Sequence, residues 1–284
     1  MNILDDLKLQ YKTGGMVQKL IFWNIGCFLL SLVFFYSFSV GKFQIPYWIA
    51  LSSDIGTFVK APWTLVTFNF FHYGFFHLIF NLMVLHFAGR LFSTYFTDKQ
   101  LLGVYVLGGI FSGLTFVLSY IVIGKSGLLV GASGAIMAIL IATATYAPFM
   151  LLRIPLIGIV KLWHVAFVIL LVDLIQMPLD NTGGHLAHLG GALFGFIYIK
   201  LLQSGKDFTK PFTTLLDTFA NLFKPKKKTP FKKVHRNTTK KVVNSFTEKD
   251  ITQKQIDDIL DKISKSGYDS LTKEEKEFLF KAGK

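Results

Sequence analysis

The chain has 284 residues, of which 52% are hydrophobic, and its formal net charge is +13. Soluble domains average about 45–50% apolar residues even with glycine counted. This chain exceeds that average although its tail after residue 204 is polar, which excludes an ordinary soluble protein and indicates a membrane protein. The single cysteine, Cys27, excludes a disulfide framework and a cysteine metal cluster. Most of the positive charge lies in the tail without a nucleic-acid motif, so we expect anionic lipid as its partner and no nucleic acid.

Six apolar segments are candidates for membrane-spanning helices, each of which needs about 20 apolar residues. They cover residues 17–40, 68–92, 101–123, 133–147, 156–177 and 185–203. The sequence therefore predicts an all-α, polytopic bundle of six helices followed by a basic, helical tail. We divide the chain into an N-terminal segment (1–16), a six-helix core (17–203), an amphipathic and polybasic segment (204–246) and a small helical tail (247–284).

Basic residues are more frequent on one side of these segments, modestly in the core and decisively in the tail. They lie before the first helix, after the second and after the fourth, ahead of the lysine-rich tail: Lys8, Lys12, Lys19, Arg90, Lys99, Arg153 and Lys161. The loops of the other side hold Lys42, Lys60 and Lys125 with Asp54 and Asp180. The positive-inside rule then places both termini in the cytoplasm. The first apolar run is long enough to span and has no small-residue cleavage site, so we expect no signal peptide.

The fourth segment begins with the stretch VGASGAIMA at residues 130–138, which holds one hydroxyl, Ser133. Its helix is interrupted by Pro148, and fourteen residues span only about 21 Å of a hydrocarbon core of about 30 Å. With its inner end near Arg153, Ser133 is expected below the outer membrane surface. Irregular backbone at that depth is tolerated only in protein or beside a wet cavity. This favours a functional serine over helix-packing filler, unless the helix continues through Pro148 as a kink.

Small residues form matching stripes on the fourth and sixth helices. The stripes consist of Gly134, Ala138 and Ala142 on one helix and of Ala187, Gly191 and Gly195 on the other. Such stripes allow two backbones to approach closely. Ser133 and His188 lie beside the outer ends of the stripes, so packing brings them within hydrogen-bond reach. A serine needs such a base to react at neutral pH.

The second helix offers groups for an oxyanion hole. His77 and Asn81 share one helical face, and His72 lies at the outer end of the helix. An imidazole, an amide and backbone N–H groups near Ser133, Gly131 included, can stabilise the oxyanion of a tetrahedral intermediate.

The acidic residues of the fifth helix complete no triad pattern in the sequence. Asp173 and Asp180 lie in or beyond that helix, and neither is placed to orient His188. A Ser–His dyad is the simpler prediction.

Other functions remain open for these residues. The membrane histidines can be structural, and an asparagine in a helix is often interhelical glue. A cluster of His72, His77, His185 and His188 is compatible with a metal site, but the H-E-x-x-H spacing of zinc proteases is absent. We therefore expect no metal and no cofactor. A transporter predicts internal repeats and paired broken helices, and the sequence has neither.

Three motifs in chain order resemble those of rhomboid-family intramembrane serine proteases. They are the H-x-x-x-N of His77 and Asn81, the G-x-S-G around Ser133 and the A-H-x-x-G around His188, with His72 five residues before His77. The stretch YVLGGIFSG at 105–113 resembles the family's third helix. The resemblance covers roughly residues 17–203.

This resemblance implies specific roles. Ser133 is the expected nucleophile and His188 the general base and acid, with His77, Asn81 and Gly131 in the oxyanion hole and Gly134, Gly191 and His72 as motif support. It implies an acyl-enzyme, substrates that are transmembrane proteins cut near the outer face, and a location in a bacterial inner membrane. The sequence departs from the family at Met137, where an aromatic residue is usual, and at the Trp63–Thr64 pair, where the family has Trp–Arg. The alternative is an inactive rhomboid-like protein that binds membrane helices.

The tail contains two further patterns. Residues 208–223 place apolar side chains on one helical face and precede a basic stretch at 224–241, which together predict a surface helix clamped to anionic lipid. A flexible charged linker is the alternative. Residues 252–282 predict two short helices with capping boxes at Thr252 and Thr272 and a stop at Gly267. This piece is too small for a core of its own and is expected to need a partner.

Overall fold

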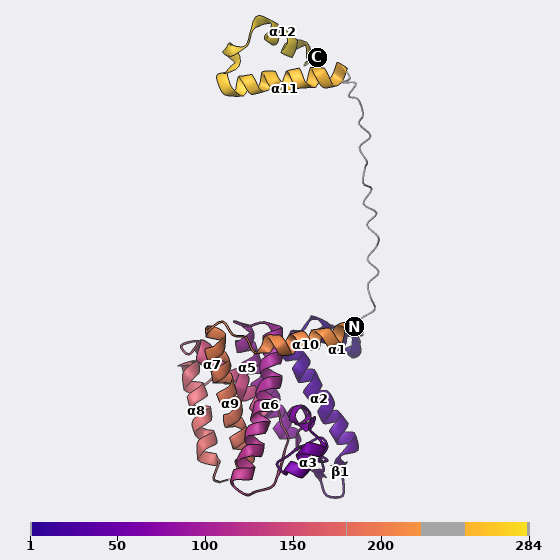
Figure 1. Cartoon of the computed structure of the whole chain (residues 1–284), viewed down its shortest axis with the longest axis vertical. Helices are drawn as coiled ribbons and strands as arrows, with labels where there is room; N and C mark the ends of the chain where they lie inside the picture. The colour runs from indigo at the N-terminus through magenta and orange to yellow at the C-terminus, as the bar shows by residue number, and fades with distance from the viewer. Residues whose placement is uncertain (1, 180, 223–247, 283–284) are drawn as a thin grey trace. The chain divides into compact units, whose positions relative to one another are not determined.

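The computed structural model describes residues 2–179, 181–222 and 248–282. The chain forms two compact units, Met1–Lys224 and Pro225–Lys284. The first unit contains a bundle of apolar helices (Figure 1), and the second is a small helical unit.

Four helices of the first unit are long and apolar enough to cross a membrane. They are α2 (Met16–Phe34), α5 (Phe75–Ser93), α6 (Asp98–Val122) and α9 (Thr182–Gln203). Two shorter apolar helices, α7 (Ser133–Tyr146) and α8 (Leu162–Gln176), pack beside them (Figure 1). The chain thus has the helices of an integral membrane protein. Each predicted segment overlaps one of these helices, but six crossings stay a prediction because α7 and α8 are short.

Helix α7 is the centre of the bundle. Every residue from Gly134 to Ala144 is buried, and the helix contacts α5, α6, α8 and α9. It ends at Tyr146, before Pro148, as the sequence predicts, because proline cannot continue a helix without losing a hydrogen bond. A helix apolar on all sides belongs in such a core.

Three predicted segments differ from the structure at one end. The first helix stops at Phe34, and a short hairpin of β1 (Tyr36–Ser37) and β2 (Lys42–Phe43) follows. In the second, the 3₁₀ turn η1 (Phe68–Phe70) precedes α5. Both differences lie in short apolar runs, in which the periodicity of the sequence alone does not separate helix from strand or turn.

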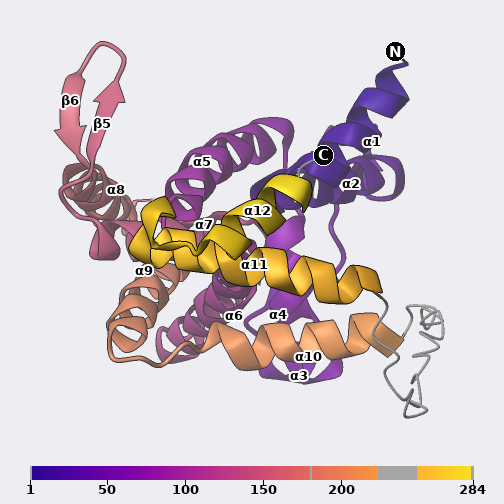
Figure 2. The same ribbon diagram turned by 90° about the horizontal axis from the view of Figure 1, so that it is seen from above.

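The predicted start of the fifth helix at residue 156 is wrong. Strands β5 (Leu151–Ile154) and β6 (Gly158–Lys161) form an antiparallel hairpin there, and α8 begins only at Leu162. The turn holds Leu156 at φ 68° and Gly158 at φ 101°, which ends any helix. Figure 2 shows this hairpin projecting away from the helices. The described residues are therefore mostly helical, with short antiparallel strand pairs between the helices.

A small sheet fixes the loop before α7 at the end of the bundle that the sequence predicts to face outward, which we call the outer end. Strand β3 (Leu51–Ser52) pairs antiparallel with β4 (Leu128–Leu129), next to the short helices α3 (Ile55–Lys60) and α4 (Thr64–Thr67). This pairing ties the chain just before Gly131 to a segment far away in the sequence.

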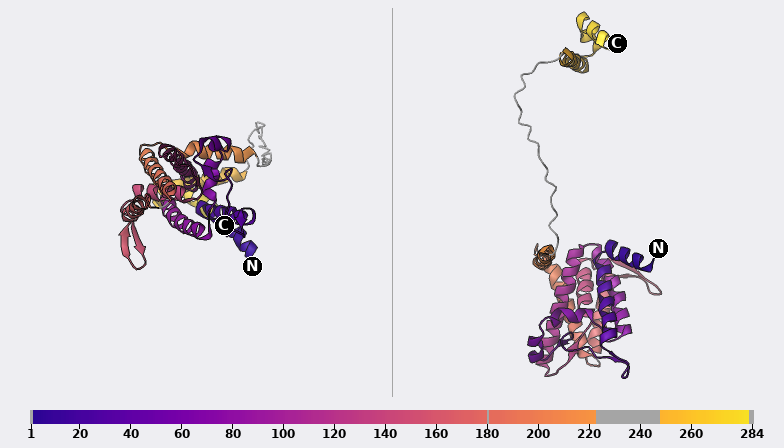
Figure 3. Two further views of the ribbon diagram at one scale, coloured as in Figure 1. Left: turned by 90° about the horizontal axis from the view of Figure 1, so that it is seen from below. Right: turned by 90° about the vertical axis from the view of Figure 1, so that its right-hand side faces the viewer.

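The opposite end of the bundle carries two helices that run across it, α1 (Ile3–Thr13) and α10 (Thr209–Leu222) (Figures 1 and 3). Thr209 packs against Gly103 of α6, and Lys99 forms an ion pair with Asp217 at 2.6 Å. Helix α10 exposes Phe208 at its start, Leu215 and Phe219. The predicted break at residue 204 therefore falls inside the first unit. The basic stretch 224–241 lies outside the described residues.

The second unit consists of α11 (Glu248–Ser266), the 3₁₀ turn η2 (Tyr268–Ser270) and α12 (Lys273–Ala282). The stop at Gly267 and the capping box of Thr272 with Glu275 are confirmed, since Thr272 N–H donates to Glu275 at 2.7 Å. The predicted start at Thr252 is wrong, because α11 begins at Glu248 and Thr252 lies inside it.

Candidate active site

Ser133 is the first residue of α7, at the end of a tightly held loop. The Gly131 N–H donates to the Phe68 carbonyl at 2.9 Å, and Ala132 is the N-cap of the helix. Gly131 has φ 136°, a conformation that suits glycine. A side chain there would also approach the His77 ring to 3.0 Å. The short G-A-S-G sequence thus turns the chain into the helix with Ser133 at its tip.

The predicted stripes on α7 and α9 pack directly against each other. A Cβ atom added at Gly191 would meet the Gly134 carbonyl, and one at Gly195 would meet the Ala138 carbonyl. Backbone therefore touches backbone along this seam, as small residues in membrane helices allow. The seam fixes the outer ends of both helices next to each other.

His188 of α9 lies opposite Ser133 of α7 across the contact between the two helices. Its Nε2 atom is 2.6 Å from the Ser133 Oγ atom, which is within hydrogen-bond range. When the imidazole carries its proton on Nδ1, the hydroxyl donates to Nε2. The pairing that the stripes predict is therefore present.

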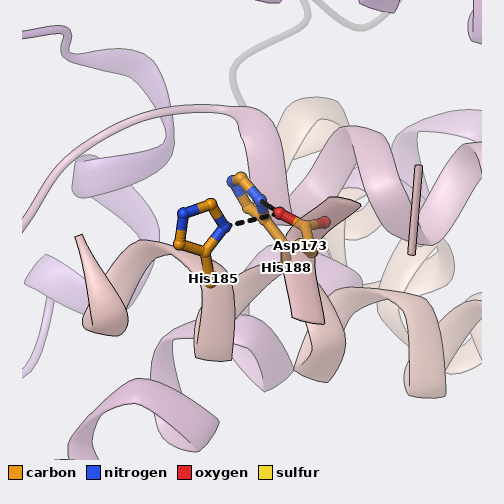
Figure 4. Close-up of side chains that lie close together, drawn as sticks. All are labelled: Asp173, His185 and His188. Atoms are coloured by element: carbon orange, nitrogen blue, oxygen red, sulfur yellow. Dashed lines mark hydrogen bonds and ion pairs between the residues drawn. The ribbon is translucent and has the colours of Figure 1, made fainter. Parts of the chain in front are cut away.

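A third side chain joins this pair from α8. Asp173 Oδ1 lies 2.9 Å from His188 Nδ1 and 2.7 Å from His185 Nδ1 (Figure 4). The Asp173 side chain is 8% exposed, so the contact is shielded from water. The prediction that neither acidic residue of this region is placed to orient His188 is therefore wrong for Asp173. Asp180 lies outside the described residues.

The feature of the sequence that could have revealed the role of Asp173 is the energetic cost of placing it in an apolar helix. An isolated carboxylate in an apolar helix is expensive and calls for a partner. Helix α8 ends at Gln176 and α9 begins at Thr182, so the outer ends of the two helices adjoin. Asp173 and His185 are close in sequence across that short connection, and this proximity indicates the contact.

A polar cavity of about 390 Å³ reaches the pair from the outer side. Its lining includes Tyr73, His77, Asn81 and the Ser133–His188 pair. The Asn81 Nδ2 atom donates to the His77 carbonyl at 2.8 Å, which holds the amide beside the cavity.

The structure gives His72 and Gly131 contacts that the sequence does not predict. His72 is fully buried, and its ring packs edge-on against that of His77 with 5.0 Å between the ring centroids. The Gly131 N–H is already bonded to Phe68, so the expectation that Gly131 donates to an oxyanion is wrong for this structure. The first N–H groups of α7 have no partner within the helix and are therefore candidates for backbone donors.

A second, apolar cavity of about 340 Å³ reaches the same residues from between α5 and α8. Phe80, Val84, Met137, Val168 and Val172 line it together with the Ser133–His188 pair. Met137, where the family usually has an aromatic residue, therefore borders the site from α7. The two cavities meet at Asn81, Ser133 and His188.

Asp173, His185 and His188 carry side chains of the types that also bind metal ions. The ligand atoms of Asp173, His185 and His188 lie within 4.8 Å of one another. Ligands around a tetrahedral zinc ion at 2.0–2.1 Å are about 3.3 Å apart, whereas the two contacts to Asp173 measure 2.7 and 2.9 Å. The arrangement fits a hydrogen-bonded set and would have to open to hold a metal.

Comparison with known proteins identifies relatives of this architecture. "Presenilin-associated rhomboid-like protein A, mitochondrial" of Danio rerio is 34% identical over 141 residues, which cover 48% of this chain and 36% of the relative. The Rattus norvegicus and Homo sapiens proteins named "Presenilin-associated rhomboid-like protein, mitochondrial" are each 32% identical, and the matches cover 49% of this chain and 37% of each relative. The chain thus matches little more than a third of the length of these relatives.

Two family models match the chain. Residues 243–281 match a family of unknown function (DUF6576), which takes in most of the described second unit. Residues 59–204 match the Rhomboid domain, which includes α5 to α9 and every candidate site residue. The chain belongs to the rhomboid family.

Proposed function

We propose that this protein is an intramembrane serine endopeptidase. The observation that carries the proposal is the 2.6 Å contact between Ser133 Oγ and His188 Nε2 beside two cavities. A serine hydroxyl is a weak nucleophile by itself and needs an adjacent base. The contact supplies that base where a substrate has room to approach.

The chemistry follows from this contact. Ser133 Oγ attacks the scissile carbonyl carbon while its proton passes to His188 Nε2. The imidazolium then gives that proton to the leaving amine as the peptide bond breaks. Water hydrolyses the acyl-enzyme, with His188 again as the base. His77, Asn81 and the first N–H groups of α7 are the proposed donors to the oxyanion.

The two cavities support a membrane protein as the substrate. The apolar cavity between α5 and α8 suits an apolar segment that arrives from lipid. The polar cavity suits the unwound backbone and the water of the second step. We propose that a transmembrane segment enters beside α8 and that its outer end is cut at Ser133.

The orientation is part of the proposal. Helices α1 and α10 lie at the end of the bundle opposite α3 (Figure 1), whereas Ser133 follows the β3–β4 sheet beside α3. The basic residues favour the cytoplasm for the end that carries α1 and α10. Cleavage then occurs near the outer face. A bacterial inner membrane is our expectation for the location, whereas the names of the relatives place those proteins in mitochondria.

A second candidate function is favoured by the relatives' names, which say rhomboid-like and mention no protease. An inactive rhomboid-like protein would bind membrane helices in the same apolar cavity without cutting them. The geometry of Ser133 and His188 argues for the protease, because a binder has no need of a paired nucleophile and base.

One experiment separates the two candidates. The purified full chain in detergent is incubated with single-span membrane proteins, and Ser133→Ala is compared with Ser31→Ala. Ser31 is a matched control because it is also a helix serine, buried in α2, and it donates only to the Cys27 carbonyl. We expect cleavage by the wild type and by Ser31→Ala but not by Ser133→Ala. Substrate capture without cleavage by all three proteins supports the binder.

A further inference from the structure

Asp173 is an unusual group for its position. It is the one buried acidic side chain among the described residues, and it sits in an otherwise apolar helix. Burying a carboxylate without strong hydrogen bonds is costly. The position therefore needs a physical reason, and among the described residues the hydrogen bonds of Asp173 come from the two histidines of α9.

Both histidines bond the same carboxylate oxygen. His185 and His188 direct their Nδ1 atoms to Oδ1 (Figure 4), while Oδ2 is buried and accepts no hydrogen bond from the described residues. A carboxylate acceptor fixes each imidazole with its proton on Nδ1. For His188 this leaves Nε2 free to accept the proton of Ser133, which is the tautomer that a general base requires.

His185 has a different role, because its hydrogen bond within this set goes to Asp173, while its ring lies edge-on against that of His188 with 5.9 Å between the ring centroids. One hydrogen bond leaves a carboxylate free to rotate about its last side-chain torsion. A second donor on the same oxygen, from the preceding turn of α9, restricts that rotation and supports the ionised form.

We propose, on the basis of the protease function above, that Asp173 is a positioning residue for His188 and that His185 holds Asp173 in place. The site then acts as a serine–histidine–aspartate array with a fourth member. During the attack the Ser133 proton moves to His188 Nε2, and the Nδ1 proton stays on His188 in its bond to Asp173. Asp173 stabilises the imidazolium by its charge and takes up no proton.

Other groups that face His188 bear on its titration. They are Ser133 on α7, Asp173 on α8, His185 on α9, and His77 and Asn81 on α5, with Tyr73 just before α5. The described residues that line either cavity include no lysine, arginine or glutamate. Asp173 is thus the only carboxylate in this set. Replacing it therefore changes the charge near His188 without altering a lysine, arginine or glutamate.

The test uses Asp173→Asn in the full chain, which keeps the size of the side chain and removes its charge. We expect kcat to fall by on the order of 10²–10⁴-fold, with KM changed less than threefold. The acidic limb of kcat/KM against pH should move to lower pH, since the imidazolium loses its counter-charge. A structural role alone would not move that limb. Unchanged kcat and an unchanged limb would overturn the proposal.

A pair of variants tests His185. Asn at position 185 keeps a donor close to the place of Nδ1, whereas Leu removes it. We expect His185→Asn to stay within about threefold of the wild-type kcat and His185→Leu to lose about tenfold or more. Equal activity of the two variants contradicts the role of His185. If Asp173→Asn does not fold, the same shift of the pH limb in His185→Leu but not in His185→Asn decides the proposal, and its absence overturns it.

Two controls separate this inference from the function on which it rests. If the wild type cleaves, Ser133→Ala does not, and Asp173→Asn behaves as the wild type, the inference fails while the protease function stands. If the wild type does not cleave, both fail. Activity lost to a chelator and restored by Zn²⁺ would assign the three side chains to a metal and overturn the inference as well.

Discussion

The two helices that meet His188 from opposite sides are packed very differently. Helix α7 is buried along eleven consecutive residues and touches α9 through backbone. Helix α8 buries only Leu162, Ala166 and Asp173, and its other side chains include exposed valines and phenylalanine. The difference indicates that Ser133 and His188, the proposed nucleophile and base, sit on a fixed seam. Asp173 and one wall of the apolar cavity instead sit on a helix with few neighbours.

The largest expected effect is the loss of a group on the seam. Ser133→Ala and His188→Ala should each lower cleavage by on the order of 10⁴–10⁶-fold, and the double variant should be no worse, because members of a catalytic unit are not additive. A serine-directed fluorophosphonate, detected by gel fluorescence, should label the wild type and neither single variant. Labelling of His188→Ala at the wild-type rate would show that the base is another group.

An intermediate effect is expected at Asn81, which faces the point where the cavities meet. Asn81→Ala should lower kcat by about 10²–10³-fold, since other oxyanion donors remain. Asn24→Ala is the matched control, because both asparagines donate Nδ2 to the carbonyl four residues earlier at 2.8 Å. Equal kcat for the two folded variants would make Asn81 structural.

The seam itself can be tested through stability. Gly191→Ala places a methyl group on the Gly134 carbonyl, so we expect it to lower the free energy of unfolding by about 1–3 kcal/mol. Gly26→Ala is the control, because a Cβ there has open space around it. Thermal unfolding in detergent measures both variants. If they unfold at the same temperature, α7 and α9 are not closely packed.

The sequence predicts the seam better than it predicts α8, for physical reasons. Small residues four apart define a helix face directly, and Pro148 ends a helix by its chemistry, so the contact of Ser133 with His188 follows from local pattern. Asp173 reaches His188 through a turn between two helices, and no periodicity encodes the angle of that turn. The β5–β6 hairpin was missed because short apolar runs look alike as helix or strand. The engagement of Gly131 with Phe68 depends on long-range strand pairing that a single sequence does not specify.

A smaller effect is expected from removing the tail. Every proposed catalytic group lies before residue 204, but α10 packs against α6, so the cut belongs after Leu222 and not after residue 204. A chain ending at Leu222 should cleave within about twofold of the full chain and bind anionic vesicles less well, because it lacks the basic stretch 224–241. Loss of cleavage by a folded protein of this length would give the second unit a part in catalysis.

The smallest effect is expected inside the second unit, at an exposed ion pair. Glu275 accepts from Lys262 at 2.8 Å and from the Thr272 N–H, and the Lys262 hydrogen bond is the main reason that the pKa of Glu275 lies below its usual value. A lowered pKa in the folded state stabilises the unit above the unfolded pKa of about 4.3, and this contribution is lost as pH falls through the folded value. Glu275→Gln should therefore speed amide exchange in α12 at pH 7 slightly, as measured by NMR in the full chain, and the difference from wild type should shrink as the pH falls through the folded pKa of Glu275. Glu274→Gln serves as the control on the same turn. An equal effect of the two variants at pH 7 would show that the cap and the Lys262 contact do not hold α12 in place.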